Sequence, residues 1–312
     1  MGTKSISKLS LTCCLLALAM IFTAAATRAE LLNIPDEPAD WNGFYAGVNF
    51  GGLFDHFDIH GHDTFVDITE QYYNATGDEG QEGHNFALFS VPGHDATNGS
   101  AVGSFDIGYN HQWNHFVAGI AGGVSVTHSY VTTKFSSFQQ NSIFPDRQIQ
   151  PQQIEDAQTY FRSFDSVQQN WSAYIGGQIG YAFNRWLFYV TGGAAFTDVD
   201  FSSFDDANSF FGFDDDIVQP HEPPPFQESN NRSLVHDDCF LVGWYIGGGT
   251  LFAITDTISA GIEYHHSDYG TATFHPAPDD AVFPNHISVD LTSDEVVFKL
   301  NVNLSTFFGS KH

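Results

Sequence analysis

Apolar positions alternate with small or polar ones along the stretch WNGFYAGVNFGG, which covers residues 41–52. The apolar parity carries Phe44, Ala46, Val48 and Phe50, and the other parity carries Tyr45, Gly47, Asn49 and Gly51. A period of two residues is typical of a β-strand, whose successive side chains point to opposite faces. Neither face suits a soluble core, because one is wholly apolar and the other is mostly glycine. We therefore expect the apolar face to contact lipid and the small face to line a narrow lumen.

The same alternation recurs along the chain and predicts eight strands, at 43–53, 102–112, 115–131, 169–183, 186–200, 240–253, 257–270 and 292–308. Three of the gaps are tight turns, at Trp113-Asn114, Asn184-Arg185 and Thr255-Asp256. The other four gaps are long, at about 54–101, 132–168, 201–238 and 271–291. Short and long connections alternate strictly, which predicts an all-β fold: an eight-stranded antiparallel up-and-down transmembrane β-barrel with long extracellular loops, spanning 43–308.

A soluble β-sandwich is the alternative fold, but it would not explain why every long gap follows an odd-numbered strand. The interior of an eight-stranded barrel is normally filled by side chains. Here many inward positions are small, so filling requires that certain tyrosines lean inward, namely Tyr45, Tyr174, Tyr189 and Tyr245. We expect at most a narrow pore. The five tryptophans fall at or near strand ends, as interfacial girdles do, at Trp41, Trp113, Trp171, Trp186 and Trp244.

The N-terminus has the features of an export signal. Lys4 and Lys8 precede an apolar run, and small residues allow a cut after Ala29 or near Ala26. We expect a signal peptide over 1–29, followed by a periplasmic segment over 30–42. Only Cys239 lies beyond that signal, so no internal disulfide is expected.

The chain is strongly acidic, with 10 Lys+Arg against 37 Asp+Glu and a formal net charge of −27. Nucleic acid is not an expected partner, because binding it requires cationic side chains. The acids gather in the long gaps, where divalent ions can bridge carboxylates to lipopolysaccharide phosphates. Outer-membrane lipids and lipopolysaccharide are therefore the expected partners.

Five stretches together resemble a known family: WNGFYAGVNFGG, GSFDIGYNHQW, IGGQIGYAFNRWLFYVTGGAAF, GWYIGGGTLFAITD and ISAGIEYHHSDYG. They are similar to the strands of small outer-membrane barrels of Gram-negative bacteria that are called outer-membrane immunogenic or surface-antigen proteins. The resemblance implies insertion by the barrel-assembly machinery, periplasmic termini and loops outside the cell. Family roles include envelope integrity, surface antigenicity and, in some members, haemin binding.

Two departures from that family stand out. Inward charges that relatives carry are mostly replaced by small or neutral residues, which leaves Glu263 and Lys299 with matching parity on adjacent strands. We expect these two to pair inside the lumen, because an unpaired buried charge is costly. The aromatic residue that the assembly machinery reads is expected at Phe308, followed by a short tail over 309–312.

Possible ligand sites lie in the long gaps. The first gap contains the candidate metal or haemin ligands His56, Asp58, His60, His62 and Asp63, and the third contains the candidate calcium ligands Asp214, Asp215 and Asp216. The alternative is a solvated acidic surface, since no known ligand spacing appears. Haemin would need His or Tyr ligands and an apolar platform. The many loop phenylalanines could supply that platform, or they pack the loops into a cap or a β-extension.

The run His265-His266-Ser267-Asp268 raises the alternative of a lipid-modifying enzyme of the outer membrane. Neighbouring side chains of a strand alternate faces, so these four cannot converge on one site. The sequence therefore predicts a non-enzymatic protein without a required cofactor, with binding of haemin or divalent metal ions as the runner-up function.

Overall fold

The computed structural model describes residues 37–73, 79–141, 154–213, 228–274, 282–284 and 286–305. Several predictions fall outside these residues: the signal peptide, the tail, Phe308, and the acids Asp214, Asp215 and Asp216. Within the described part of the chain, no helix has the length and apolar character needed to cross a membrane.

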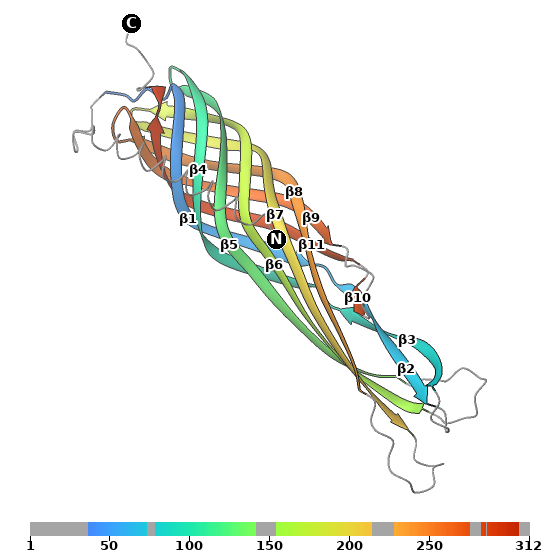
Figure 1. The fold of residues 1–312 in the computed structure, drawn as a ribbon. Helices are drawn as coiled ribbons and strands as arrows, with labels where there is room; N and C mark the ends of the chain where they lie inside the picture. Colours follow the sequence, from blue (N-terminus) through green and yellow to red (C-terminus); the bar gives the residue numbers. More distant parts are fainter. Residues whose placement is uncertain are drawn as a thin grey trace, which may run out of the picture.

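Eight strands close into an antiparallel barrel in the order β1-β11-β9-β8-β7-β6-β5-β4 (Figure 1). They are β1 (Gly43–Ile59), β4 (His94–Trp113), β5 (Phe116–Asn141), β6 (Ile154–Phe183), β7 (Trp186–Phe213), β8 (Glu228–Ala253), β9 (Ile258–Phe274) and β11 (Ile287–Asn303). Neighbours in the barrel follow chain order, and β11 closes against β1. The predicted fold class is confirmed.

The four long gaps are not loops as predicted, because strands occupy most of their described residues. Each barrel strand runs well beyond its predicted end; β6 alone has 30 residues. Three further strands, β2 (His62–Tyr73), β3 (Glu79–Val91) and β10 (Val282–Pro284), form a separate sheet in the order β10-β2-β3. The long connections are therefore continuations of the barrel wall rather than irregular segments.

A β-bulge in β6 explains why the sequence pattern ended too early. The register of β6 against β7 shifts between Gln169 and Ser172. Buried positions are even-numbered on one side of this shift, as at Gln178, and odd-numbered on the other, as at Val167. A bulge inserts an extra residue and thereby exchanges the faces of a strand. Beyond it the outward positions are polar, so the pattern of apolar outward residues stops while the strand continues.

The barrel opens into two facing sheets at the end away from the tight turns. β5 stops pairing with β4 after Val126, and β8 pairs with β9 only from Trp244 onward. Beyond these points β5–β8 form one sheet and β4, β1, β11 and β9 form the other; we call this part the extension. An apolar core fills its interior, made of Phe57, Ile59, Val167, Ala195, Val199, Phe201, Leu241, Tyr245, Tyr269, Ala272, Phe274, Ile287, Val289 and Leu291.

An apolar belt surrounds the barrel near the tight turns. Its exposed side chains include Phe44, Phe50, Phe116, Ile120, Ile175, Ile179, Phe188, Val190, Ile246 and Phe298. The belt ends abruptly: on β1 the outward Phe54 is followed by His56, and on β11 Val296 is followed by Asp294. Apolar side chains exposed all around a closed barrel are stable only against lipid. The belt therefore marks the membrane-spanning part.

The turn end differs from the prediction in three details. Trp113 pairs with Phe116, which moves the first turn to Asn114 and His115. The last strand ends at Asn303 and not near 308, because the backbone N–H of Phe44 donates to the Ser305 hydroxyl, at 3.1 Å, instead of to a backbone carbonyl of the last strand. Trp41 does not join an outer girdle, since only 9% of it is exposed.

Candidate functional site

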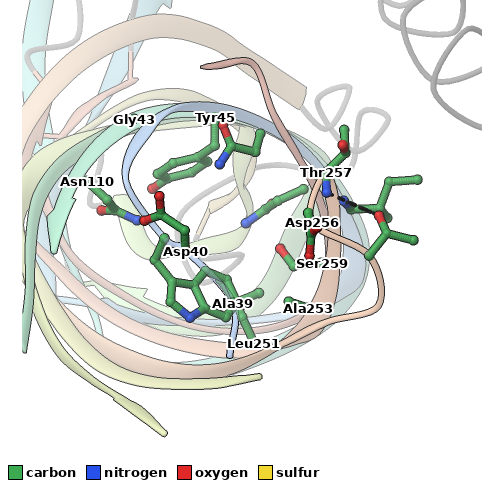
Figure 2. A pocket seen from close by; sticks show the side chains of 15 residues that line it. Ala39, Asp40, Gly43, Tyr45, Asn110, Leu251, Ala253, Asp256, Thr257 and Ser259 are labelled. Atoms are coloured by element: carbon green, nitrogen blue, oxygen red, sulfur yellow. Dashed lines mark hydrogen bonds between the residues drawn. The ribbon is translucent and has the colours of Figure 1, made fainter. Parts of the chain in front are cut away.

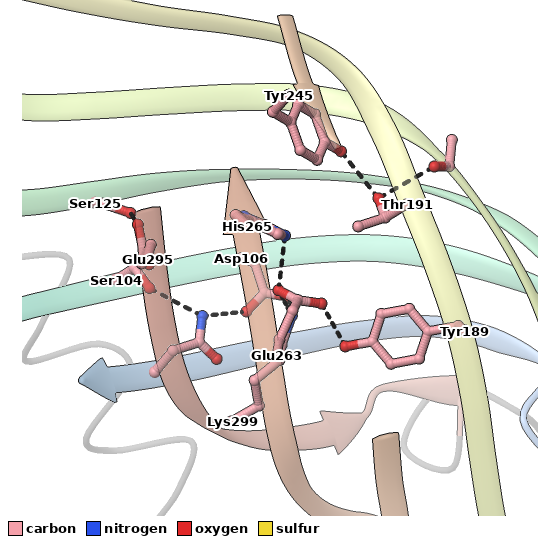
Figure 3. A network of polar contacts seen from close by, with 12 residues as sticks. Ser104, Asp106, Ser125, Tyr189, Thr191, Tyr245, Glu263, His265, Glu295 and Lys299 are labelled. Atoms are coloured by element: carbon pink, nitrogen blue, oxygen red, sulfur yellow. Dashed lines mark hydrogen bonds and ion pairs between the residues drawn. The ribbon is translucent and has the colours of Figure 1, made fainter. Parts of the chain in front are cut away.

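The predicted lumen ion pair is present in the middle of the barrel (Figure 3). Lys299 Nζ lies 2.9 Å from Glu263 Oε1 and 3.2 Å from Asp106 Oδ2, and all three side chains are buried. Glu263 and Lys299 sit on β9 and β11 as diagonal neighbours, because Lys299 is opposite Gly261. The lysine therefore balances two carboxylates rather than the single one expected.

Further polar side chains complete this network. His265 Nε2 lies 3.1 Å from Glu263 Oε1, and the Tyr189 hydroxyl donates a hydrogen bond to Glu263. Asn49 Nδ2 donates to Asp106 Oδ1 at 2.8 Å. The expectation of a mostly neutral lumen, with only two charges left, is thus wrong. Asp106 and His265 have inward parity in the sequence, and that parity was the signal that could have found them.

Tyrosine rings fill the space that the lumen glycines leave. A Cβ added at Gly108 would overlap the ring of Tyr45, and one added at Gly123 would overlap Tyr174. Tyr189 covers Gly249 and Tyr245 covers Gly176 in the same way. The four tyrosines lean inward, as filling of the barrel requires, so small and large residues complement each other across the strands.

The chain before β1 closes the mouth of the barrel at the turn end (Figure 2). Trp41 lies inside, where it packs in an apolar cluster with Val117, Leu187 and Leu251. Its backbone N–H donates to Gln112 Oε1 at 2.9 Å. A small cavity of about 40 Å³ lies in the mouth, with room for a few waters. The described end of the predicted periplasmic segment, residues 37–42, thus acts as a plug.

Arg185 holds this plug in place. Its guanidinium donates to the carbonyl oxygens of Glu37, at 2.9 Å, and of Ala253, at 2.7 Å. One contact is to the segment and the other to β8, so the arginine ties the plug to the barrel wall. Between this plug and the core of the extension, tyrosine rings and the ionic network occupy the lumen.

A closed antiparallel barrel of eight strands, with short turns at one end and a lipid-facing belt, is the architecture that crosses outer membranes. The fold is that of an outer-membrane-type transmembrane β-barrel. No family model matches the chain, and no curated protein matches it.

Solved structures of similar fold include three outer-membrane or surface proteins. Neisserial surface protein A is 11% identical, with a TM-score of 0.28, over 84% of this chain and 97% of that chain. Ail of Yersinia pestis is 11% identical, with a TM-score of 0.25, over 83% and 99%. The outer membrane protease OmpT of Escherichia coli is 10% identical, with a TM-score of 0.31, over 84% and 97%. The assignment of the barrel rests on its own strands, register and belt.

The predicted metal ligands of the first gap do not converge on one site. His56 faces outward and its ring bonds Thr97 at 3.0 Å, while Asp63 accepts a hydrogen bond from Ser90 at 2.7 Å. His62 turns inward and is buried. Asp58 and His60 alone remain together, on the outer surface of the extension.

Asp58 and His60 gain a partner that sequence reasoning missed. Asp290 of β11 stands directly opposite Asp58, and the ligand atoms of Asp58, His60 and Asp290 all lie within 4.8 Å of one another. We call these three the rim triad. His60 Nε2 is 2.9 Å from Asp290 Oδ2, and the hydrogen bond with Asp290 raises the pKa of His60. Asp290 lies more than 200 residues away, so only closure of β11 against β1 reveals it.

The run from His265 to Asp268 does not form a catalytic set. His265 faces the lumen, whereas His266 faces outward and its Nδ1 lies 2.9 Å from Asp294 Oδ1. Asp268 accepts the backbone N–H of Gly270 at 3.0 Å. The alternation of faces that the strand imposes separates these side chains.

Proposed function

We propose that the barrel is a non-enzymatic envelope protein that displays a long acidic β-structure at the cell surface. One observation carries this proposal: the strands run unbroken from the lipid-facing belt into the extension, and β6 has about three times the residues that cross a membrane. Side chains fill the interior along the length of these strands. The barrel wall therefore supports the extension rather than enclosing a channel.

The charge on the outer surface supports this role. Acidic side chains follow the belt on five strands, at Asp58, Asp198, Asp200, Asp238, Asp268, Asp290 and Asp294. A ring of carboxylates just above the lipid repels lipopolysaccharide phosphates unless divalent cations lie between them. The proposed partners are therefore outer-membrane lipids, lipopolysaccharide with its cations, and the barrel-assembly machinery during insertion.

Cysteine labelling of intact cells tests the topology. In a Cys239→Ser background, Thr132→Cys places a thiol on the exposed face of the extension, and His115→Cys places one in a tight turn. We expect a membrane-impermeant maleimide to label the Thr132 variant on intact cells and the His115 variant only after lysis. The reverse pattern would invert the topology, and labelling of neither would show that the extension does not reach the surface.

The rim triad favours a second candidate function, binding of a divalent cation. Two carboxylates directly opposite each other repel, and a cation shared with the imidazole removes that repulsion. Calorimetric titration with Zn²⁺, Mn²⁺ and Ca²⁺ tests it, with Asp290→Asn expected to lower the number of ions bound by one and Asp294→Asn, which leaves that number unchanged, as the matched control. Haemin binding stays a prediction, tested by a spectroscopic titration of the same protein.

A further inference from the structure

A second group of polar side chains is buried in the extension, on the inner face of β6 and β7 and at the start of β2, where the charge of Asp165 acts on the pKa of His62. Ser163 stands opposite Asp205 and Asp165 opposite Ser203, so the two acids are diagonal neighbours on the inner face. The start of β2 adds an imidazole and a hydroxyl. We call this group the inner chamber, and it comprises His62, Thr64, Ser163, Asp165, Ser203 and Asp205.

These side chains are buried with almost no hydrogen bonds. His62 is 8% exposed and neither of its ring nitrogens has a partner. Asp205 is 1% exposed and its carboxylate oxygens make no hydrogen bond of good geometry, although the hydroxyls of Ser163 and Ser203 lie close enough to lower its pKa; the Thr64 hydroxyl also lacks a partner. The one hydrogen bond within the group runs from Ser163 to Asp165 at a long 3.4 Å. A buried polar atom without a partner costs about 1–3 kcal/mol, so a group of them is unfavourable when empty.

The charges of the inner chamber are also unbalanced. Burial, with the carboxylate of Asp165 nearby, raises the pKa of Asp205 to about 7. Burial lowers the pKa of His62, which keeps its imidazole neutral. A neutral imidazole is the form that binds metal. A buried carboxyl group whose pKa is raised by burial becomes ionised when a cation lies beside it, because the cation lowers that pKa.

We propose that the inner chamber binds one divalent transition-metal ion, such as Zn²⁺ or Mn²⁺, with His62, Asp165 and Asp205 as ligands. An imidazole with two carboxylates is the donor set that such ions accept, and the hydroxyls of Ser163 and Ser203 lie beside it. Among the described residues only the rim triad has three ligand atoms within 4.8 Å, so the chamber side chains turn toward each other when the ion enters.

The consequence of binding is mechanical attachment of one sheet to another. His62 begins β2, whereas Asp165 and Asp205 belong to the long sheet, so a shared ion joins the β10-β2-β3 sheet to the extension. Only apolar contacts such as the stacked rings of Phe89 and Phe161, 4.9 Å apart, otherwise make this connection near the chamber. The ion thus replaces unpaired polar atoms with a cross-link.

Metal titration of the folded barrel in detergent tests this proposal. An Asp58→Asn/Asp290→Asn background removes the rim triad, after which we expect one equivalent of Zn²⁺ or Mn²⁺ to bind by calorimetry and elemental analysis. Asp205→Asn and Asp165→Asn are expected to lower the affinity at least tenfold, whereas Asp63→Asn, next to His62 and exposed, leaves it unchanged.

Hydrogen exchange supplies a second readout. The ion should slow exchange of the amides of residues 62–64 and 161–169 in the background protein and not in the Asp205→Asn variant. Circular dichroism of that variant should stay barrel-like, so loss of binding is not loss of the fold. Absence of binding in the background protein, binding that survives both chamber substitutions, or binding of Ca²⁺ alone would each overturn the assignment.

Discussion

Lys299 is fully enclosed by the lumen, with two carboxylates and a cover of tyrosine rings around it. Removing its charge leaves Asp106 and Glu263 buried without a counter-ion. Breaking a buried ionic group by removal of one partner typically costs about 3–5 kcal/mol, more than the group contributes relative to apolar residues. Lys299 therefore contributes to stability by neutralising two buried carboxylates, and a count of ion pairs does not measure that contribution.

We expect Lys299→Met to lower the free energy of unfolding by about 3–5 kcal/mol, measured by urea unfolding in detergent. Adding Asp106→Asn and Glu263→Gln to the same protein should recover most of that loss, because no charge is then left unpaired. Lys134→Met, on the exposed face of the extension, is the control and should change stability little. A triple variant less stable than Lys299→Met would contradict this view of the network.

The acid in the inner chamber predicts a pH dependence. Asp205 has a pKa of about 7 when folded and an ordinary value when unfolded, so the folded state binds more protons between about pH 4 and pH 7. In metal-free protein, stability should therefore fall as pH rises through this window, by up to about 4 kcal/mol. The charged group that faces Asp205 is Asp165, and Asp165, Asp63 and His286 face His62, so the part due to Asp205 is the difference from a variant.

Asp205→Asn should remove this part of the pH dependence and make the metal-free extension more stable than the wild type at pH 8. Thermal unfolding at pH 5 and pH 8, with chelator present, measures both. If the unfolding temperatures of the wild type and of the Asp205→Asn variant changed equally between pH 5 and pH 8, Asp205 would be ionised in the folded state at both pH values.

At the scale of single strands, two glycines of β4 differ in how much space a side chain would find beside them. Gly108 faces the lumen beneath Tyr45, whereas a Cβ at Gly103 would meet no atom within 4 Å. Gly108→Ala must displace the ring of Tyr45 and should cost about 1–3 kcal/mol, as overpacking does. Gly103→Ala should be neutral or slightly stabilising. Urea unfolding of the two variants compares them, and equal stabilities would refute the role of Tyr45 as filler.

The strands near the membrane could be predicted from sequence because lipid enforces one rule, apolar outside and small or polar inside. The extension could not, because its two faces obey a different rule: Phe57 and Phe201 face inward, while acids such as Asp58 face outward. The bulge at Gln169–Ser172 also exchanges parity within β6. Glu263 and Lys299 were found by parity on adjacent strands, whereas Asp290 joins Asp58 only through closure of the barrel.

At the scale of the whole molecule, side chains occupy the described interior at three levels: the plug around Trp41, the ionic network with its tyrosines, and the apolar core of the extension. We expect planar-bilayer recordings to show no steady single-channel conductance. Trp41→Ala removes only the first level, so it should conduct no better than the wild type. A regular conductance in either protein would show that the lumen opens, and would favour a pore function over display.

The length of β6 has a consequence for how the molecule bears force. At about 3.3 Å per residue its 30 residues span about 100 Å, of which the bilayer holds about a third. Ladder hydrogen bonds lie perpendicular to antiparallel strands, so a pull along this axis strains many of them in shear at once instead of peeling them singly. A force that a partner applies at the distal end is therefore opposed by hydrogen bonds along the entire wall. That force is transmitted to the base of the barrel in the lipid.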